Sequence, residues 1–546
     1  MKRSFLLLVL AGQCFFATAQ SWPDTVASIE KIFSRYNSNS VPGAELAISR
    51  NGQVIFSKAW GMADLEHNIA LTTQSLIEAG SVSKQFTAAS ILLLEQQGKL
   101  SLEDDVRKYI PELPDYGKVI TLRHMMQHTS GLKDWGSVMD LAGWSRGTRA
   151  YSNEYALYVI SLQQTLNNIP GDEYIYSNSN YNLQAIIVQR VSGLSLADFT
   201  SKYIFEPAGM KHTEWRSNYR KIVKDRAIAY SKGSGQTFLT NMPNENAYGN
   251  GGLLTTAEDL LIWNHYYLSG KLGSPSLLPN QTATRKLNNG RTNYYGAGLM
   301  MDSIGGWQAI AHSGATASYR ANLEYFPEVG LSIAWLSNTS AFDSDTPNVT
   351  NAVRRLFVPN RRPASVVRRE LNVAVDAAKL ASYAGWYRDP RNNAGLKLYI
   401  KDGKLSSLFP TANLTAIADN VFMLGNNKLE LGYKKGLLAT AGPESIYYEK
   451  MEDVDANAKY LEDFVGQYYS KEAEAMYYLV LKDGRLLLQI RPTTTFPMNP
   501  TYKDAFDCPF GPVYFMRDLK RGIMELKISV GRARNVVFRK IYTGTP

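Results

Sequence analysis

The chain has 546 residues, of which 45% are hydrophobic and 20% are charged. This length exceeds what one ordinary hydrophobic core supports, so we expect at least two domains, and the composition excludes a wholly disordered or membrane-spanning protein. The net charge is +10, but no run of lysines and arginines is interleaved with aromatic residues, so we expect no nucleic-acid partner.

The start of the chain has the pattern of a secretory signal peptide. Lys2 and Arg3 form a charged beginning, an apolar stretch begins at Phe5, and the small residues at 17–19 fit a cleavage site. The apolar stretch is shorter than a bilayer-spanning helix requires, and no later apolar run is long enough. We therefore expect removal of residues 1–19, export to the periplasm or the medium, and no integral membrane segment in the mature chain.

Cysteine content and charge limit the partners of the mature chain. Cys14 lies inside the predicted signal peptide, where lipid attachment is the alternative to cleavage. Cys508 is then the one cysteine left, which excludes an intrachain disulfide and a two-cysteine metal site. A basic exported protein is attracted to an anionic surface, so we expect association with the cell envelope. We expect neither a metal nor a cofactor.

A β-hairpin opens the folded part of the chain. Its strands are predicted at residues 44–49 and 54–59, because both runs are rich in residues that favour β structure. Asn51-Gly52 joins the two runs, and this dipeptide favours the type I′ turn that connects paired strands.

A buried helix is predicted next, from about Ser81 to Gln97, and Gly98 ends it. Its interior is apolar nearly all round, which is typical of a helix in the centre of a domain. Ser81 and Lys84 form an S-x-x-K motif at its start, preceded by Gly80. Residues three apart share a helix face, so the Lys84 amine can reach the Ser81 hydroxyl.

This pairing has a chemical purpose. A serine hydroxyl is a poor nucleophile until a base takes its proton, and a buried lysine with a lowered pKa can be that base. The amino end of the helix also favours developing negative charge. The motif is short enough to occur by chance, so its weight depends on the buried helix that follows it and on partner motifs elsewhere.

The partner motif is Y-x-N, and the chain contains three copies, which begin at Tyr151, Tyr176 and Tyr248. The first copy runs into residues typical of a helix start, and the last runs into glycines typical of a turn. Tyr176-Ser177-Asn178 follows a Pro-Gly pair and precedes a predicted helix ending near Gly193. A phenol on such a loop can face a cleft, so Tyr176 is favoured.

The fold class follows from where strands and helices alternate. Residues 100–270 are predicted to be mainly helical, with Thr255 and Glu258 forming a capping box for one helix. Early and late strands around a helical middle predict an α+β domain at 20–357, with an antiparallel sheet flanked by helices plus a helical lobe. The predicted late strands are residues 308–311, 319–325 and 331–336, the last two joined by a turn at 327–330.

A third motif follows one of these strands. His312-Ser313-Gly314 ends the predicted strand and is followed by small residues. Glycine at a strand edge lets the backbone of a substrate approach closely. The alternative is a simple turn at the strand end, and the active-site interpretation is preferred because the other two motifs are present.

The remainder of the chain is predicted to be β-rich. An arginine-rich linker at 358–378 leads to a domain at 379–546, made of two related units at about 379–450 and 460–546. We interpret them as antiparallel β-barrel-like repeats. The two matches between the units share one offset: Leu380, Tyr383, Gly385 and Tyr387 with Leu461, Phe464, Gly466 and Tyr468, and 401–405 with 482–486.

As an ordered set, these motifs resemble the serine β-lactamase-related, penicillin-binding-protein-like superfamily. Its members include class C β-lactamases, D-aminopeptidases, DD-carboxypeptidases and esterases. The resemblance covers about residues 25–357, and the tail resembles the lipocalin-like domains of some relatives. The motifs that carry it are Gly80 to Lys84, His128 to Leu132, Tyr176 to Asn178, Gly251 to Leu253 with Thr256 to Leu260, and His312 to Gly314.

The resemblance implies a role for each catalytic position. Ser81 would be the acylated nucleophile, and Lys84 and Tyr176 would share the general-base and general-acid work. Asn178 would position the substrate. The backbone N–H groups of Ser81 and Ala315 would form the oxyanion hole.

The third motif departs from the β-lactamase pattern, which usually carries lysine where this chain has His312. The resemblance implies that His312, Ser313 and Gly314 line the substrate pocket. A histidine is mostly neutral at pH 7, so β-lactams would lose an anchoring ion pair. We therefore expect a serine hydrolase of esters or small D-amino-acid peptide amides. An arginine from elsewhere in the fold is the alternative anchor, and it would favour a β-lactamase.

Other patterns and functions compete with this interpretation. Gly143-Trp144-Ser145-Arg146-Gly147 matches the G-x-S-x-G elbow, but that elbow needs a strand before it. His124 and His128 share a helix face as zinc ligands do, but Met125 replaces the required glutamate. A penicillin-binding receptor that is acylated with little turnover is the non-enzymatic alternative.

A final expectation concerns the tail. The linker and the change of composition after residue 360 predict that the catalytic domain keeps its acylation machinery without the β units. A tail loop that overhangs the cleft would change the substrate preference of such a fragment.

Overall fold

A computed structural model describes residues 21–342, 348–361, 373–408, 410–442, 444–491, 494–518 and 522–542. The predicted signal peptide with Cys14, and residues 362–372 of the predicted linker, lie outside the described residues. None of the helices in these ranges is both long and apolar enough to cross a membrane.

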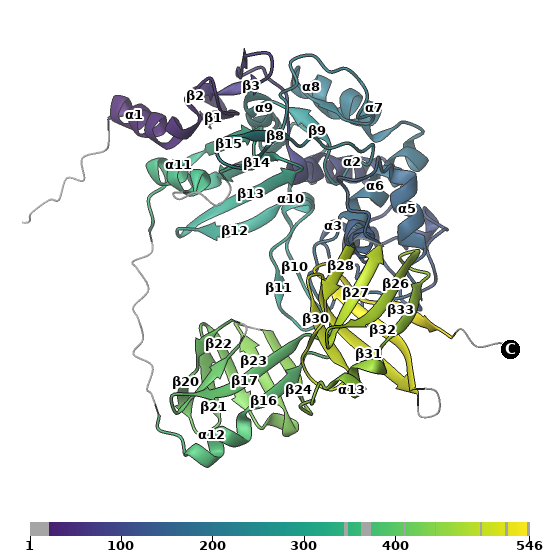
Figure 1. Cartoon of the computed structure of the whole chain (residues 1–546). Helices are drawn as coiled ribbons and strands as arrows, with labels where there is room; N and C mark the ends of the chain where they lie inside the picture. The colour runs from purple at the N-terminus through teal and green to yellow at the C-terminus, as the bar shows by residue number, and fades with distance from the viewer. Residues whose placement is uncertain are drawn as a thin grey trace, which may run out of the picture.

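A six-stranded antiparallel sheet forms the centre of the catalytic domain (Figure 1). Its order is β12-β13-β14-β15-β1-β2, and β1 pairs with β15 from Ala44 opposite Ser337 onward. The predicted sheet built from both ends of the domain is thereby confirmed. Its strands are β1 (Ala44–Arg50), β2 (Gln53–Trp60), β12 (Met300–Ile304), β13 (Trp307–Thr316), β14 (Tyr319–Phe326) and β15 (Leu331–Ser337).

Helices cover both faces of this sheet because alternate side chains of its strands point to opposite sides. Leu46 and Ile48 of β1 belong to the apolar cluster of α1 (Trp22–Phe33) and α11 (Val349–Phe357). Ala47, between them, belongs to the larger cluster that includes α9 (Ala257–Leu268).

The helical lobe lies beside the sheet and is organised around α2 (Lys84–Gln96), whose residues are buried from Lys84 to Leu94. The predicted helix thus exists, but Ser81 lies on a 3₁₀ turn, η2 (Gly80–Ser83), that precedes it. The other lobe helices are α3 (Leu122–Met126), α4 (Trp135–Leu141), α5 (Asn153–Ser161), α6 (Asn178–Ser192), α7 (Leu196–Thr200), α8 (Glu206–Ala208) and α10 (Leu277–Thr282).

The cap of α9 differs from the predicted one. The hydroxyl of Thr256 accepts a hydrogen bond from the backbone N–H of Asp259 at 3.1 Å, so the helix begins one residue later than expected. The reason is that Thr255 is still part of a short strand, β9 (Leu253–Thr255), which pairs with β5 (Ile77–Glu78) just before η2.

Two nine-stranded antiparallel sheets follow, which confirms the predicted barrel-like repeats. Equivalent tyrosines make the same contact in both units: the Tyr387 hydroxyl donates to the Tyr383 carbonyl at 2.9 Å, and the Tyr468 hydroxyl to the Phe464 carbonyl at 2.8 Å. The first unit contains α12 (Ala377–Tyr383), β16 (Gly385–Arg388), β17 (Gly395–Lys401), β18 (Lys404–Ser407), β19 (Ala412–Asn413), β20 (Thr415–Ala418), β21 (Val421–Leu424), β22 (Asn427–Leu431), β23 (Leu437–Ala441) and β24 (Glu444–Met451). The second contains α13 (Ala458–Glu462), β25 (Gly466–Ser470), β26 (Ala475–Lys482), β27 (Arg485–Arg491), β28 (Thr494–Pro497), β29 (Asn499–Pro500), β30 (Ala505–Cys508), β31 (Gly511–Asp518), β32 (Gly522–Val530) and β33 (Ala533–Ile541).

The second β unit packs directly against the helical lobe, and the first unit lies beside the second (Figure 1). Lys133 and Glu472 form an ion pair of 3.0 Å across this contact, with side chains 0% and 7% exposed. The Tyr477 hydroxyl donates to the Leu141 carbonyl at 2.8 Å. One apolar cluster runs through the lobe and the second unit. This continuous core argues against the expected independence of the catalytic domain.

Candidate active site

Ser81 and Lys84 lie where the 3₁₀ turn η2 passes into α2. The Lys84 Nζ is 3.1 Å from the Ser81 Oγ, and the lysine side chain is fully buried beneath the serine. Burial holds the pKa of Lys84 well below its ordinary value, and the positive charges of Arg146 and Arg532 lower it further. Lys84 therefore loses its proton more readily than an ordinary lysine, as a general base requires.

Two further contacts fix which way that amine points. The Lys84 Nζ donates to the Asn178 Oδ1 at 3.0 Å and to the Asn250 backbone carbonyl at 2.5 Å. Both oxygens only accept hydrogen bonds, so both N–H groups of a neutral amine are used. The charged ammonium donates its third N–H to the Ser81 Oγ, and once Lys84 has lost this proton its lone pair faces the Ser81 hydroxyl. Asn250 was not predicted, because it acts through its backbone.

Tyr176 approaches the same point from the loop before α6. The Lys84 Nζ lies 4.8 Å from the centre of its ring. Burial raises the pKa of Tyr176, and a hydrogen bond with Ser81 partly offsets that rise, so the phenol holds its proton. Tyr151 and Tyr248 do not line the pocket, and the Tyr151 hydroxyl donates to the Trp144 carbonyl.

The third motif lies within β13 and does not end it, contrary to the expectation from sequence. Its glycine permits the strand to press against η2: a Cβ on Gly314 would lie 2.0 Å from the Ala79 carbonyl oxygen and 3.1 Å from the Ser81 nitrogen. A Cβ on Gly80, where φ is +51°, would lie 2.6 Å from the Ala315 nitrogen. Because neither glycine has a side chain, β13 and η2 can pack closely, which brings the backbone nitrogens of Ser81 and Ala315 near each other.

His312 is held as a neutral, buried imidazole. Its Nδ1 lies 2.6 Å from the Ser313 carbonyl, which only accepts, so the ring proton is on Nδ1. Its Nε2 then accepts from the Tyr295 hydroxyl at 2.8 Å. Burial lowers the pKa of His312 to about 4, and the nearby Lys84 contributes to this lowering. His312 therefore supplies no fixed positive charge to the pocket.

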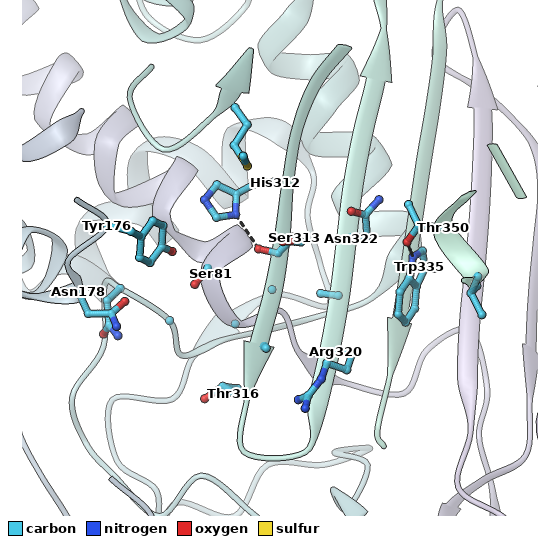
Figure 2. Close-up of a pocket in the computed structure, with 18 of the residues that line it drawn as sticks. Ser81, Tyr176, Asn178, His312, Ser313, Thr316, Arg320, Asn322, Trp335 and Thr350 are labelled. Atoms are coloured by element: carbon cyan, nitrogen blue, oxygen red, sulfur yellow. Dashed lines mark hydrogen bonds between the residues drawn. The ribbon is translucent and has the colours of Figure 1, made fainter. Parts of the chain in front are cut away.

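A pocket of about 690 Å³ opens above Ser81 and is lined by the predicted residues Tyr176, Asn178 and His312 to Ala315. Figure 2 shows Tyr176, Asn178 and His312 around Ser81, with Ser313 on the neighbouring strand. Lys84 lies beneath these groups and does not line the pocket. The pocket also contains Arg146, Arg320 and Arg532, which were not predicted as site residues.

The competing motifs lie elsewhere. Ser145 follows helix α4, with no strand before it, and does not line this pocket. His128 is buried, and its Nδ1 accepts from the Ser177 backbone N–H at 3.1 Å. Among the described residues, the one cluster of three potential metal ligands is Asp64, Glu66 and His67, which do not line the pocket.

Comparison with known proteins identifies the family. The family described as Beta-lactamase matches residues 29–355, which is more than half of the chain. The chain belongs to the Beta-lactamase family. This membership confirms the resemblance seen in the sequence, and it makes the chain a serine hydrolase.

Relatives within this family extend the match into the β units. The D-aminopeptidase of Brucella anthropi is 24% identical over 524 residues, which cover 92% of this chain and 95% of that protein. Penicillin-binding protein 4* of Bacillus subtilis is 27% identical over 358 residues, covering 61% and 78%. The octameric penicillin-binding protein homologue from Pyrococcus abyssi has a TM-score of 0.54 and 20% identity, covering 86% and 98%. This last likeness confirms the β-lactamase/transpeptidase-like fold.

Proposed function

We propose that this chain hydrolyses esters and small peptide amides, including amides of D-amino acids, through an acyl-enzyme on Ser81. The observation that carries the proposal is the buried Lys84 amine 3.1 Å from the Ser81 hydroxyl, with its two N–H groups engaged by Asn178 and Asn250. Similarity over 92% of the chain to a D-aminopeptidase supports the amide substrates.

The proposed reaction has two halves. The Ser81 oxygen attacks the substrate carbonyl while its proton passes to the Lys84 amine. The bond to the leaving group then breaks as that atom receives a proton through Tyr176, which leaves an ester on Ser81. Water then attacks this ester while one of its protons passes to the Lys84 amine. The bond between the acyl carbon and the Ser81 oxygen breaks, that oxygen regains a proton from the same groups, and the acid is released. The backbone N–H groups of Ser81 and Ala315 would stabilise the oxyanion in both halves.

One feature supports esters and amides over β-lactams. His312 is neutral, so the third motif lacks the fixed charge that β-lactamases use for the drug's carboxylate. The β-lactamase function and the slowly turning penicillin receptor remain the competing functions. Burst kinetics with a chromogenic ester separates the receptor from an enzyme, because a receptor gives one equivalent of product and then stops. Rates on a panel of esters, D-amino-acid amides and β-lactams separate the β-lactamase from the proposal.

The nucleophile is tested by covalent labelling. Ser81→Ala should abolish turnover of esters and the mass increase produced by a fluorophosphonate, because no hydroxyl remains to be acylated. The matched control is Ser145→Ala, which should retain labelling and most of the activity. Labelling that persists in Ser81→Ala but disappears in Ser145→Ala would refute the proposal.

We also propose that the chain is exported and that its basic surface associates with the cell envelope. The support is the charged, apolar and small-residue pattern of residues 1–19 and the net charge of +10. Fractionation of cells that express the full chain, with mass spectrometry of the mature amino terminus, tests both statements. A cytoplasmic chain that keeps residue 1 would refute export.

A further inference from the structure

The turn between β32 and β33 carries Arg532 from the second β unit to the rim of the active-site pocket. Its backbone is held on the catalytic domain from two sides. The Arg532 carbonyl accepts from the Asp134 backbone N–H at 3.1 Å and from the Asn167 Nδ2 at 2.9 Å. The Arg534 backbone N–H donates to the Asn167 Oδ1 at 2.7 Å. Contacts with the catalytic domain thus fix the position of Arg532.

Asp134, which holds the Arg532 turn, also contacts the catalytic region. The Asp134 Oδ2 accepts from the backbone N–H of Asn178 at 2.6 Å, so one residue holds both the Arg532 turn and the amino end of α6. The guanidinium carbon of Arg532 lies 4.6 Å from the centre of the Tyr176 ring. Among the described residues, no carboxylate or other hydrogen-bond acceptor is in contact with this guanidinium. Its donors therefore point toward solvent and whatever occupies the pocket.

The other two arginines of the pocket are already engaged. The Arg146 Nε donates to the buried Glu245 carboxylate at 2.9 Å. The Arg320 guanidinium donates to the backbone carbonyls of Ala317 and Tyr319 at 3.0 and 2.7 Å. Of the described residues that line the pocket, none is aspartate or glutamate. This charge distribution suits an anionic group on the substrate.

We propose that Arg532 is a specificity-determining residue, which selects substrates whose leaving group carries a carboxylate. The leaving group is assigned because Tyr176, which Arg532 covers, is the group that would protonate it. A guanidinium binds a carboxylate through two parallel hydrogen bonds, so position and charge are both recognised. This proposal rests on the acyl-enzyme function proposed above. It makes the second β unit contribute to substrate selection, and it makes Arg532 the alternative carboxylate anchor expected from the sequence, so anionic β-lactams compete for the same site as anionic esters and amides.

A pair of thioesters with the same acyl group tests the proposal. One has thioglycolate as its leaving group, and the other has the neutral 2-mercaptoacetamide, so the two differ in one charge. The wild-type chain should prefer the thioglycolate ester in kcat/KM. Arg532→Ala should lower that preference by about 10- to 100-fold, the scale of a hydrogen bond to a charged group. Arg532→Lys should keep part of the preference, and Arg532→Glu should reverse it.

Because the measured quantity is a ratio, any effect of Arg532 on Lys84 cancels, since both thioesters use Lys84. Arg539→Ala is the matched control: Arg539 lies on β33 of the same unit and does not line the pocket, so the preference should persist. A preference unchanged in Arg532→Ala, or equal losses for both thioesters, would overturn the proposal. Failure of the wild-type chain to be labelled by a neutral fluorophosphonate would instead count against the acyl-enzyme function.

Ionic strength gives a test that needs no variant. The wild-type preference for the thioglycolate ester should fall as sodium chloride is raised, because Arg532 is exposed and salt screens exposed charges. The rate for the neutral thioester should change much less. A preference that does not respond to salt would contradict a role for this exposed cation, whatever the stability of the Arg532 variants.

Discussion

The Tyr295 hydroxyl donates a hydrogen bond of 2.8 Å to the His312 Nε2, and both residues are buried. The Ser313 carbonyl at Nδ1 fixes the tautomer of this histidine, and the Tyr295 contact then satisfies the other ring nitrogen and holds the ring in the pocket wall. The position occupied by lysine in β-lactamases is therefore a neutral, fully hydrogen-bonded part of the wall in this chain.

Loss of the Tyr295 hydroxyl should destabilise the protein. In Tyr295→Phe the His312 Nε2 remains buried without a donor, so the free energy of unfolding should fall by about 1–3 kcal/mol. Urea denaturation followed by tryptophan fluorescence measures this change. Tyr294→Phe is the control, because Tyr294 is 67% exposed and its change should stay within about 0.5 kcal/mol. Equal stability of both variants would show that the contact contributes nothing.

The rate of acylation should rise with pH and then become constant. Only neutral Lys84 can accept the Ser81 proton, and its pKa is held well below the ordinary lysine value, chiefly by burial. Protonation at low pH should therefore remove activity, and the rate should already be constant at a pH where an ordinary lysine is still charged. Single-turnover acylation between pH 5 and 10 measures this profile.

Lys84→Arg is the companion variant, because an arginine does not lose its proton in proteins. It should cost at least about 10²-fold in acylation rate at every pH. A circular dichroism spectrum like that of the wild type would confirm that the variant folds. A wild-type rate that follows the titration of an ordinary lysine would contradict the role assigned to burial.

The choice of Tyr176 among three tyrosine motifs can be tested with a matched pair. Tyr176→Phe should lower kcat by at least about 10²-fold, because the hydroxyl beside Ser81 is lost. Tyr151→Phe should leave kcat nearly unchanged, since that hydroxyl is bound to the Trp144 carbonyl away from the pocket. Combined with Lys84→Ala, the Tyr176→Phe loss should be far from additive, since the groups act together. Full activity in Tyr176→Phe would exclude the assignment.

What could be predicted from the sequence is mostly local. Ser81 and Lys84 lie within one helical turn, so their contact depends on the helix alone. The Asn51-Gly52 turn and the helix α2 could likewise be predicted, because each is determined by residues close together in the sequence. The sheet assembled from both ends of the domain followed from the order of these local elements.

Contacts between residues that are far apart in the chain leave no comparable pattern in the sequence. Asn250 meets Lys84 through its backbone carbonyl, and a backbone group has no sequence signature. Tyr295 and Arg532 reach the site through tertiary packing, and neither belongs to a recognisable motif. The extent of β13 was missed because small residues usually end a strand, whereas here Gly314 is needed where the strand presses on η2.

The buried ion pair between Lys133 and Glu472 provides a test of whether the second β unit is part of the catalytic fold. Removing one partner leaves an uncompensated buried charge, so Lys133→Met should lower the free energy of unfolding by about 3–5 kcal/mol. The double variant Lys133→Met with Glu472→Leu should recover most of this loss. The exposed pair of Lys503 and Glu452, at 56% and 75% exposed, is the control, and its removal should change stability much less because solvent screens it.

A chain that ends at Val358 should then be insoluble or fail to be labelled at Ser81. Truncation removes the Tyr477 and Glu472 contacts and exposes the apolar cluster that the lobe shares with the second unit. A chain lacking only the first β unit, residues 373–451, should fold better, because that unit has an apolar cluster of its own. Solubility, thermal unfolding and fluorophosphonate labelling of both chains show whether the catalytic domain folds without each β unit. A soluble, fully labelled fragment ending at Val358 would show that the catalytic domain is independent after all.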